Sequence, residues 1–268
     1  MDKIIGFIGA GNMAKAMIGG IIHSKFFSAE HIIVSNPHQP KLQRISQKYG
    51  VLTTTNNKEV ARKSDILILS VKPKIYPIII EEIKEDIKKN IVIVSIAAGK
   101  TIASIEKSFG KTVKVVRAMP NTPALVGEAM SCVDANKEVS REEIQEIISL
   151  FQTFGEVEEI AEGLMDVVTA VGGSLPAYIY MFIEAIADGA VKEGMPRDKA
   201  YKIISQAVLG SAKMVLETGE HPGKLKDMVT SPGGTTIEAV ASLESSGFRS
   251  ALIQAVQACT QKSRDMKD

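Results

Sequence analysis

Residues 3–14, Lys-Ile-Ile-Gly-Phe-Ile-Gly-Ala-Gly-Asn-Met-Ala, decide the fold of this chain. Their apolar, β-branched first half predicts a buried strand, and their end opens a helix expected at about Met13–His23. Between the two, Gly-x-Gly-x-x-Ala is the dinucleotide-binding fingerprint in its strand–turn–helix context. Gly9 allows a tight turn, Gly11 lets a pyrophosphate approach the backbone, and Ala14 keeps the helix close to the sheet. We therefore expect the first N–H groups of the helix to bind a pyrophosphate, the alternative being a glycine-rich turn in some other α/β protein.

The composition is that of a globular protein without a strongly charged partner. The chain has 268 residues, of which 45% are hydrophobic and 24% charged, and its net charge is +1. This balance gives no electrostatic argument for binding nucleic acid or an anionic membrane. Two cysteines, Cys132 and Cys259, are too few for a disulfide framework or a structural zinc site.

The ends and the apolar stretches of the chain suggest a cytoplasmic protein. A strand expected from Lys3 leaves no room for a signal peptide before the fold. The longest apolar helical stretch, residues 176–190, includes Glu184 and Asp188 and is expected to be too short for a bilayer.

Strands alternate with helices along the first part of the chain, which predicts a Rossmann-type, doubly wound parallel sheet covered on both faces. After residue 160 only helices are expected, so we predict a dinucleotide-binding domain at 1–160 and an all-helical domain at 161–268. The helical domain must bury its apolar faces internally, against the cofactor domain or against a second subunit. The expected strands after the first are 32–35, 51–53, 65–70, 91–94 and 113–117, and the expected later helices are 163–171, 176–192, 197–217, 235–245 and 248–262.

The end of the second strand favours NADP over NAD. In NAD-specific folds of this kind an acidic residue usually ends that strand and accepts from the ribose 2′-hydroxyl. Here the strand ends in Ser35-Asn36, which can donate to a 2′-phosphate, with His38 as one nearby basic residue. Alternatively, Ser35 and Asn36 only shape a turn, and the pocket accepts either cofactor.

Two further strand exits are expected at the same carboxyl edge, where doubly wound sheets bind their ligands. They are Ser70-Val71-Lys72-Pro73 and Ala97-Ala98-Gly99, whose small residues would let the nicotinamide ribose lie against the backbone. Lys72 can be a phosphate ligand or base, or a solvated turn residue. The histidines lack metal-ligand spacing and no hydrolytic motif occurs, so no metal is expected and the cofactor should supply the chemistry.

Residues 229–240 contain a second candidate site. Pro232-Gly233-Gly234 predicts a tight turn directly before a helix, which leaves the N–H groups of Gly234, Thr235 and Thr236 beside two threonine hydroxyls. Such a group of donors suits a small carboxylate, although a helix start without a ligand is the commoner reading of the pattern alone.

These motifs together resemble the pyrroline-5-carboxylate reductase family, and the resemblance runs essentially from end to end. It is most specific at Val229–Thr236, which reverses the preference for a simple helix start there. The other stretches that carry it are residues 6–14, 71–73, 97–99, 119–123, 219–222 and 247–249.

The resemblance implies reduction of 1-pyrroline-5-carboxylate to L-proline by NAD(P)H, the last step of proline biosynthesis. It implies a Rossmann domain followed by a helical domain that interlocks with another subunit to form a homodimer or higher oligomer. It places the substrate carboxylate at Gly234-Thr235-Thr236, together with Ser231, and completes that site with a neighbouring subunit. Thr236 is the expected hydrogen-bond donor to the substrate. Cofactor contacts are expected at Ile8, Gly9, Ala10, Gly11, Asn12, Met13, Ser35, Asn36, Asn57, Ser70, Val71, Lys72, Pro73, Ala97, Ala98 and Gly99.

The chain departs from the family pattern just before residue 176. Relatives usually read Ser-Gly-Ser-Gly-Pro-Ala where this chain has Gly172-Gly173-Ser174-Leu175-Pro176-Ala177. Leu175 adds bulk and would penalise a positive φ, and Gly172 removes a hydroxyl. Two other functions therefore stay open: a cofactor-binding regulatory paralogue without turnover, and a related imine or β-hydroxyacid reductase. The latter would use a lysine of the helical domain, for which Lys192, Lys199, Lys202 and Lys213 are available.

Overall fold

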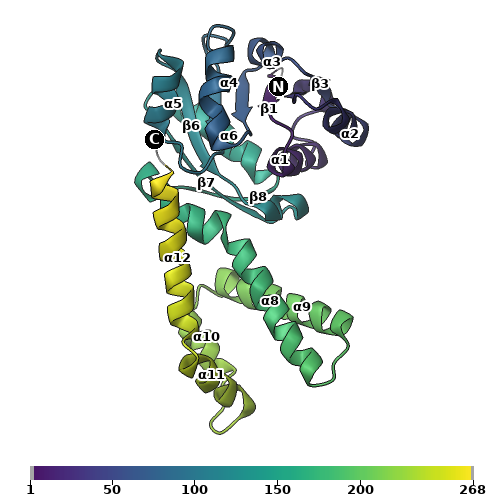
Figure 1. Cartoon of the computed structure of the whole chain (residues 1–268), viewed down its shortest axis with the longest axis vertical. Coiled ribbons are helices and arrows are strands. Elements are labelled where there is room, and N and C mark those ends of the chain that lie inside the picture. Colours follow the sequence, from purple (N-terminus) through teal and green to yellow (C-terminus); the bar gives the residue numbers. More distant parts are fainter. Residues whose placement is uncertain (1–2, 267–268) are drawn as a thin grey trace. The chain divides into compact units, whose positions relative to one another are not determined.

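A computed structural model describes residues 3–266 and places an eight-stranded sheet at the centre of the first part of the chain (Figure 1). The strand order is β3-β2-β1-β4-β5-β6-β7-β8, so that the order reverses between β1 and β4. β1 to β6 are parallel, β7 is antiparallel to β6, and β8 is parallel to β7. The strands are β1 (Ile5–Ile8), β2 (Ile32–Ser35), β3 (Leu52–Thr54), β4 (Ile66–Leu69), β5 (Val92–Ser95), β6 (Lys114–Met119), β7 (Ala129–Ala135) and β8 (Gly155–Glu159).

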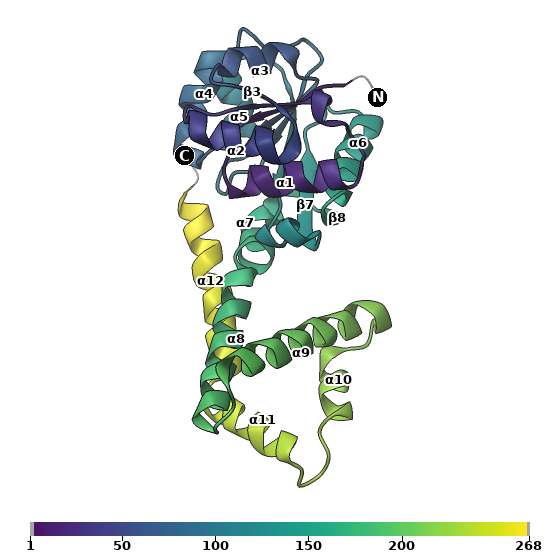
Figure 2. The ribbon, with the colours of Figure 1, turned by 90° about the vertical axis from the view of Figure 1, so that its right-hand side faces the viewer.

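The central strands are buried on both faces because helices cover both faces of the sheet, as the figures show (Figures 1 and 2). Alternate residues serve opposite faces: in β4, Ile68 packs with α1, α2 and α6, whereas Leu69 packs with α3, α4 and α5. The predicted α/β, doubly wound fold is confirmed. The helices are α1 (Asn12–His23), α2 (Gln39–Tyr49), α3 (Asn57–Lys63), α4 (Tyr76–Ile83), α5 (Ile102–Phe109) and α6 (Arg141–Gln152).

Three elements, β7, α6 and β8, were not predicted from the sequence. Of these, β8 reads Gly-Glu-Val-Glu-Glu and lies at the edge of the sheet, where charged side chains face solvent and the usual apolar signal of a strand is absent. α6 has a capping box between Ser140 and Glu143 and buries Ile147 and Phe151. The capping pattern and the spacing of these apolar residues are visible in the sequence and could have predicted this helix.

The chain divides by its contacts into two compact units. The Rossmann unit extends to Ser174 and resumes at Ala258, and the helical unit is Leu175–Gln257. The first boundary between the units thus follows Ser174, which is later in the chain than the predicted boundary at 160/161. The residues from Ala258 on belong to the Rossmann unit again.

The helical unit has little core of its own. Its buried residues within the described chain are Ala187, Ala200 and Ile204, where α8 packs on α9. The predicted helices appear within a few residues of their expected bounds, and α10 was not predicted. The later helices are α7 (Met165–Val168), α8 (Leu175–Lys192), α9 (Arg197–Thr218), α10 (Pro222–Met228), α11 (Thr235–Ser245) and α12 (Phe248–Asp265), the last of which crosses from one unit into the other.

A π-helix, Thr169–Gly173, follows α7, and residues 162–192 are helical except for a bend at Ser174, which precedes α8. In length and composition this 31-residue segment could cross a membrane, which the shorter stretch considered in the sequence could not. Leu175 begins α8 without backbone strain, because among residues 3–266 Lys25 is the one non-glycine residue with a positive φ.

Candidate dinucleotide and substrate sites

The turn after β1 requires glycine at position 9. Gly9 has φ +110°, and a Cβ there would lie 2.5 Å from the carbonyl oxygen of Ser70. The Gly9 N–H donates to the Ser35 carbonyl at 2.9 Å, and the Ser70 hydroxyl donates to the Ile8 and Gly9 carbonyls at 3.0 Å. The exits of β1, β2 and β4 are therefore held together at one edge of the sheet, at the point where the strand order reverses.

Gly11 differs from Gly9, because the protein itself does not require it to be glycine. It is the N-cap of α1 with an extended backbone, φ −77°, and a Cβ there would meet nothing within 4 Å. The first turn of α1 has neither a side-chain cap nor an acidic residue, so its N–H groups are open to an anion. Ala14 is fully buried against the sheet, as expected. An open cradle at Gly11 and uncapped N–H groups fit the pyrophosphate of a dinucleotide.

At the end of β2, the side chain of Ser35 turns inward. It is buried, and its hydroxyl donates to Oδ1 of Asn57 at 2.7 Å. Nδ2 of Asn57, which is half-buried, donates to Oε2 of Glu82 at 2.9 Å. Asn36 accepts from the His38 N–H at 3.0 Å, which leaves its own amide N–H groups available as donors. Asn36 and Asn57 are thus partly exposed polar side chains at this strand end, unlike the buried Ser35.

Tyr76 forms hydrogen bonds to the ends of both β4 and β5. Its hydroxyl donates to the Leu69 carbonyl at 2.5 Å and accepts from Ser95 at 3.1 Å. Burial raises the pKa of Tyr76 far above its ordinary value, so the phenol stays neutral. Beyond these contacts Lys72 is exposed, whereas Ala97 and Gly99 are buried. Gly99 has φ +74°, and a Cβ there would lie 2.9 Å from Cβ of Met266, so the end of the chain packs on this loop.

The predicted substrate residues lie in the helical unit, apart in the chain from every predicted cofactor residue. Gly233 has φ +67° and Gly234 is the N-cap of α11, with its N–H donating to the Ser231 carbonyl at 3.1 Å. No side chain caps α11, and Thr235 is exposed while Thr236 is half-buried. The Gly234 N–H, expected to be open, is therefore used within the turn, whereas the N–H groups of Thr235 and Thr236 have no side-chain cap and lie beside two hydroxyls, an arrangement that suits a carboxylate.

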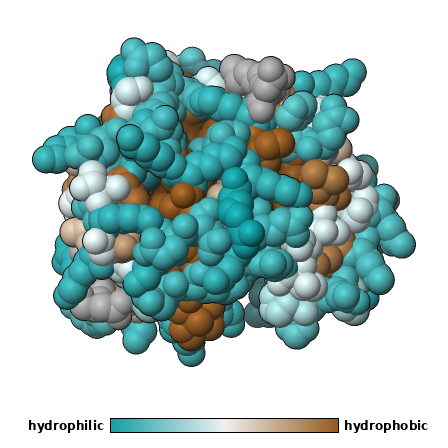
Figure 3. Space-filling view, turned by 90° about the horizontal axis from the view of Figure 1, so that it is seen from above, coloured by the Kyte–Doolittle hydropathy of each residue, from teal (hydrophilic) through white to brown (hydrophobic). Residues whose placement is uncertain are grey.

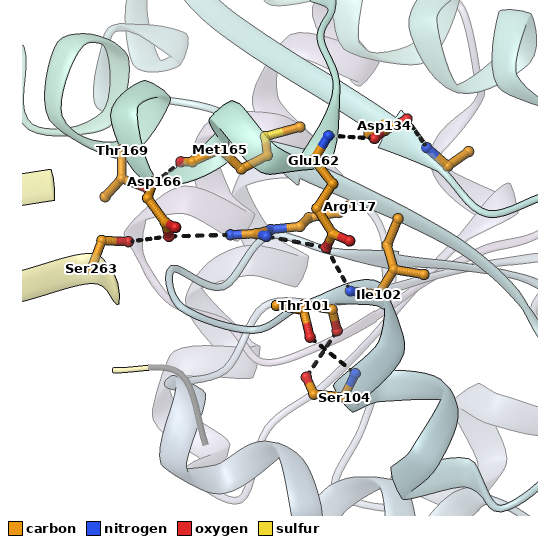
Figure 4. A network of polar contacts seen from close by, with 11 residues as sticks. Thr101, Ile102, Ser104, Arg117, Asp134, Glu162, Met165, Asp166, Thr169 and Ser263 are labelled. Carbon is orange, nitrogen blue, oxygen red and sulfur yellow. Dashed lines mark hydrogen bonds and ion pairs between the residues drawn. The ribbon is translucent and has the colours of Figure 1, made fainter. Parts of the chain in front are cut away.

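A buried ion network, which was not predicted from the sequence, joins distant parts of the Rossmann unit (Figure 4). Arg117 in the middle of β6 is fully buried and donates to Oε1 of Glu162 at 3.1 Å, and that oxygen also accepts from the Ile102 N–H at 2.7 Å. On its other side, Nη2 of Arg117 lies 4.0 Å from Asp166, which accepts from the Ser263 hydroxyl of α12 at 2.9 Å. Its only signal in the sequence was an arginine inside an apolar strand.

The other reactive groups give no sign of separate chemistry. Burial raises the pKa of the Cys132 thiol, which keeps it protonated and inert. Within residues 3–266 no group of three or more histidine, cysteine or acidic side chains is placed to hold a metal ion.

The fold and its open carboxyl edge define a dinucleotide-binding protein of the doubly wound α/β class. Comparison with known families agrees: residues 4–99 match the family NADP oxidoreductase, coenzyme F420-dependent, and residues 162–266 match pyrroline-5-carboxylate reductase dimerisation.

The particular family follows from full-length relatives. Pyrroline-5-carboxylate reductase of Escherichia coli is 49% identical over 99% of both chains, and human pyrroline-5-carboxylate reductase 2 is 44% identical over 98% of this chain and 83% of its own. Among solved structures, Plasmodium falciparum pyrroline carboxylate reductase with NADP bound has a TM-score of 0.92 at 33% identity, covering 99% of this chain and 98% of that one. The chain belongs to the pyrroline-5-carboxylate reductase family.

Proposed function

We propose that this protein reduces 1-pyrroline-5-carboxylate to L-proline with NADPH, NADH being a possible second donor, in the last step of proline biosynthesis. The observation that carries the proposal is the 49% identity to the Escherichia coli reductase over 99% of both chains. That similarity spans both the Gly9–Met13 turn and the Val229–Thr236 stretch, so both candidate sites are included.

The reaction adds a hydride and a proton to a C=N bond. The cyclic imine is readily protonated at nitrogen, and the iminium carbon then accepts the hydride that the reduced nicotinamide supplies. The residues of this chain would bind and orient. The first turn of α1 would hold the pyrophosphate, and the loops at residues 70–73 and 97–99 would line the nicotinamide half.

The turn at Gly234-Thr235-Thr236 would bind the substrate carboxylate, with Ser231 beside it and a neighbouring subunit completing the site. Thr236 would donate a hydrogen bond to the substrate. Its hydroxyl is a poor acid, so its contribution is to position the ring and not to protonate it.

The helical unit accounts for the partner that we propose, a second copy of this chain. Many of its large apolar side chains are exposed, such as Met181 at 69% and Leu216 at 84%, which is the surface expected of an interface. The apolar 162–192 segment fits the same role, and we place the oligomer in the cytoplasm with neither a membrane nor a nucleic acid as partner.

The test is steady-state oxidation of NADPH and NADH with pyrroline-5-carboxylate, using the wild type, Thr236→Val and Thr236→Ser. Valine should lower kcat/KM for the imine roughly 10- to 100-fold, because a hydrogen bond to the reacting ligand is lost, and serine should keep most of it. Nucleotide binding should be unchanged in both.

Other outcomes identify the alternatives. Tight nucleotide binding without reduction of any cyclic imine would favour the regulatory paralogue. Activity measurements on Leu175→Gly would then show whether the leucine side chain causes the loss of turnover. Reduction of a β-hydroxyacid's keto form in place of the imine would favour the other reductase class.

A further inference from the structure

The structure places a carboxylate at the end of β2, where the local sequence has none. The Ser35 hydroxyl, the Asn57 amide and the Glu82 carboxylate form one continuous chain of hydrogen bonds of 2.7 and 2.9 Å. These three residues come from β2, α3 and α4, so the arrangement exists only in the folded Rossmann unit. Glu82 is exposed, and Asn57 lies between it and the buried serine.

The position of this carboxylate matters because of what the end of the second strand does in doubly wound folds. That end lies beside the ribose of the adenosine half, and an acidic group there accepts from a 2′-hydroxyl while repelling a 2′-phosphate. The contacts also fix the Asn57 amide: its oxygen accepts from Ser35, and its nitrogen points to Glu82. A ligand at this strand end would therefore contact the Asn57 amide, whose orientation is fixed by a hydrogen bond to the negatively charged Glu82.

The charge of Glu82 is not neutralised by neighbouring basic residues. Within residues 3–266 Glu82 has no ion-pair partner, whereas the adjacent Glu81 pairs with Lys84 at 2.9 Å. The basic residues of α3 nearest to Asn57 are already paired, because Lys58 and Arg62 both lie within 3.6 Å of Asp86.

We propose that Glu82 determines cofactor specificity by acting through Asn57 to weaken the binding of a 2′-phosphate relative to a 2′-hydroxyl. The proposal rests on the proposed function, since it concerns how that enzyme chooses between NADPH and NADH. Ser35 and Asn36 at the strand end favour NADP, and Glu82 reduces this preference. NADH therefore binds better relative to NADPH than it would without Glu82.

The experiment compares Glu82→Gln with Glu81→Gln in the full-length protein. Glutamine at 82 can still accept from Asn57 but carries no charge, and the control removes a charge one residue away that already has a lysine partner. The dissociation constants of NADP+ and NAD+ are measured by titration calorimetry without substrate, and melting temperatures confirm that the variants fold.

We expect the NAD+/NADP+ ratio of dissociation constants to rise about fivefold in Glu82→Gln at low salt, through tighter NADP+ binding. The ratio should stay at the wild-type value in Glu81→Gln, and the fivefold effect should shrink as ionic strength rises. A ratio that does not change in Glu82→Gln, or equal changes for both nucleotides, would overturn the proposal, because a merely structural role affects both alike.

The design separates this proposal from the proposed function. If the ratio shifts but the wild type does not reduce pyrroline-5-carboxylate, the function is wrong and the role of Glu82 stands. If the wild type is active and the ratio does not respond, the function stands and the role of Glu82 is wrong.

Discussion

The Rossmann unit and the helical unit bury apolar side chains to very different extents. In the first, the central strands β1, β2, β4 and β5 are fully buried, and their side chains belong to two large apolar clusters. The face of the molecule drawn in Figure 3 is mostly hydrophilic, with separate apolar groups. In the second, three small or medium residues form the buried core, while Leu216, Met181 and Met228 are 84%, 69% and 67% exposed. One unit has a large buried core, whereas the other exposes apolar side chains that a second copy of the chain would cover.

Charges placed on the exposed face of α9 should prevent two copies of the chain from associating, and this is the largest effect that we expect. Leu209 and Leu216 are seven residues apart on one side of α9, and both are exposed in the single chain. The double variant Leu209→Glu/Leu216→Glu should weaken dimerisation at least about a hundredfold, because two charges would be buried without partners. Light scattering across a dilution series measures it.

The matched control is Lys199→Glu, an exposed charge reversal on another side of the same helix. It should leave the oligomer intact. Nucleotide binding should survive in all variants, since the cofactor turn belongs to the other unit; an unaffected oligomer in the double variant would contradict the division of roles.

Removing Arg117 should test how far the Rossmann unit depends on its buried network. Arg117→Met would remove the buried cation that lies 3.1 Å from Glu162 and 4.0 Å from Asp166, and it should lower the free energy of unfolding by about 3–5 kcal/mol. Denaturant unfolding measures this effect. Arg141→Met, which breaks an exposed pair with Glu159, should change stability very little, and equal losses in the two variants would argue against a special role for the network.

Substitutions of the two glycines in the first turn should have different effects, one on the stability of the fold and the other on nucleotide binding. Gly9→Ala should lose about 2–4 kcal/mol of stability, because φ is +110° and the new Cβ would lie 2.5 Å from the Ser70 oxygen. Gly11→Ala should fold normally, since its Cβ meets nothing of the protein, yet bind NADP+ at least about tenfold more weakly. Calorimetry and thermal melting give both values, and normal NADP+ binding by Gly11→Ala would remove Gly11 from the site.

The smallest expected effect concerns acid stability. Partial burial raises the pKa of Glu143, but hydrogen bonds from Lys114 and the Ser140 N–H outweigh it, and the net pKa is below its ordinary value. A lowered pKa stabilises the fold above the pKa of the unfolded chain, and this contribution disappears as pH falls through the lower, folded value. Glu143→Gln should therefore cost less than about 1 kcal/mol at pH 7 and nothing well below pH 4. Unfolding curves at both pH values would show it.

The parts of the fold that the sequence predicted are those with a local cause. The strand at Ile5–Ile8, the turn at Gly9 and the long helices each follow from neighbouring residues, through apolar periodicity or a required backbone conformation. The edge strand β8 was missed because its charged residues hide the pattern on which that reasoning depends.

The parts of the site that could not be predicted depend on distant partners. Ser35 was interpreted as a donor to the cofactor, but its hydroxyl meets Asn57, and the carboxylate of that region comes from Glu82, far along the chain. The same holds for Arg117, whose partners are supplied by residues 162–166 and, through Asp166, by Ser263. Hydrogen bonds across such separations have no signature in a single sequence.

The return of the chain to the Rossmann unit at Ala258 also constrains how the protein is made. The helical unit, residues 175–257, must be synthesised in full before Ser263 can reach Asp166. At about 5–20 residues per second, synthesis of this segment takes roughly 4–17 s, during which Arg117 and Asp166 lack the helix that closes over them. A nascent chain therefore holds an incomplete Rossmann unit until Ser263 leaves the ribosome, and a truncated product that stops within the helical unit should be a target for degradation.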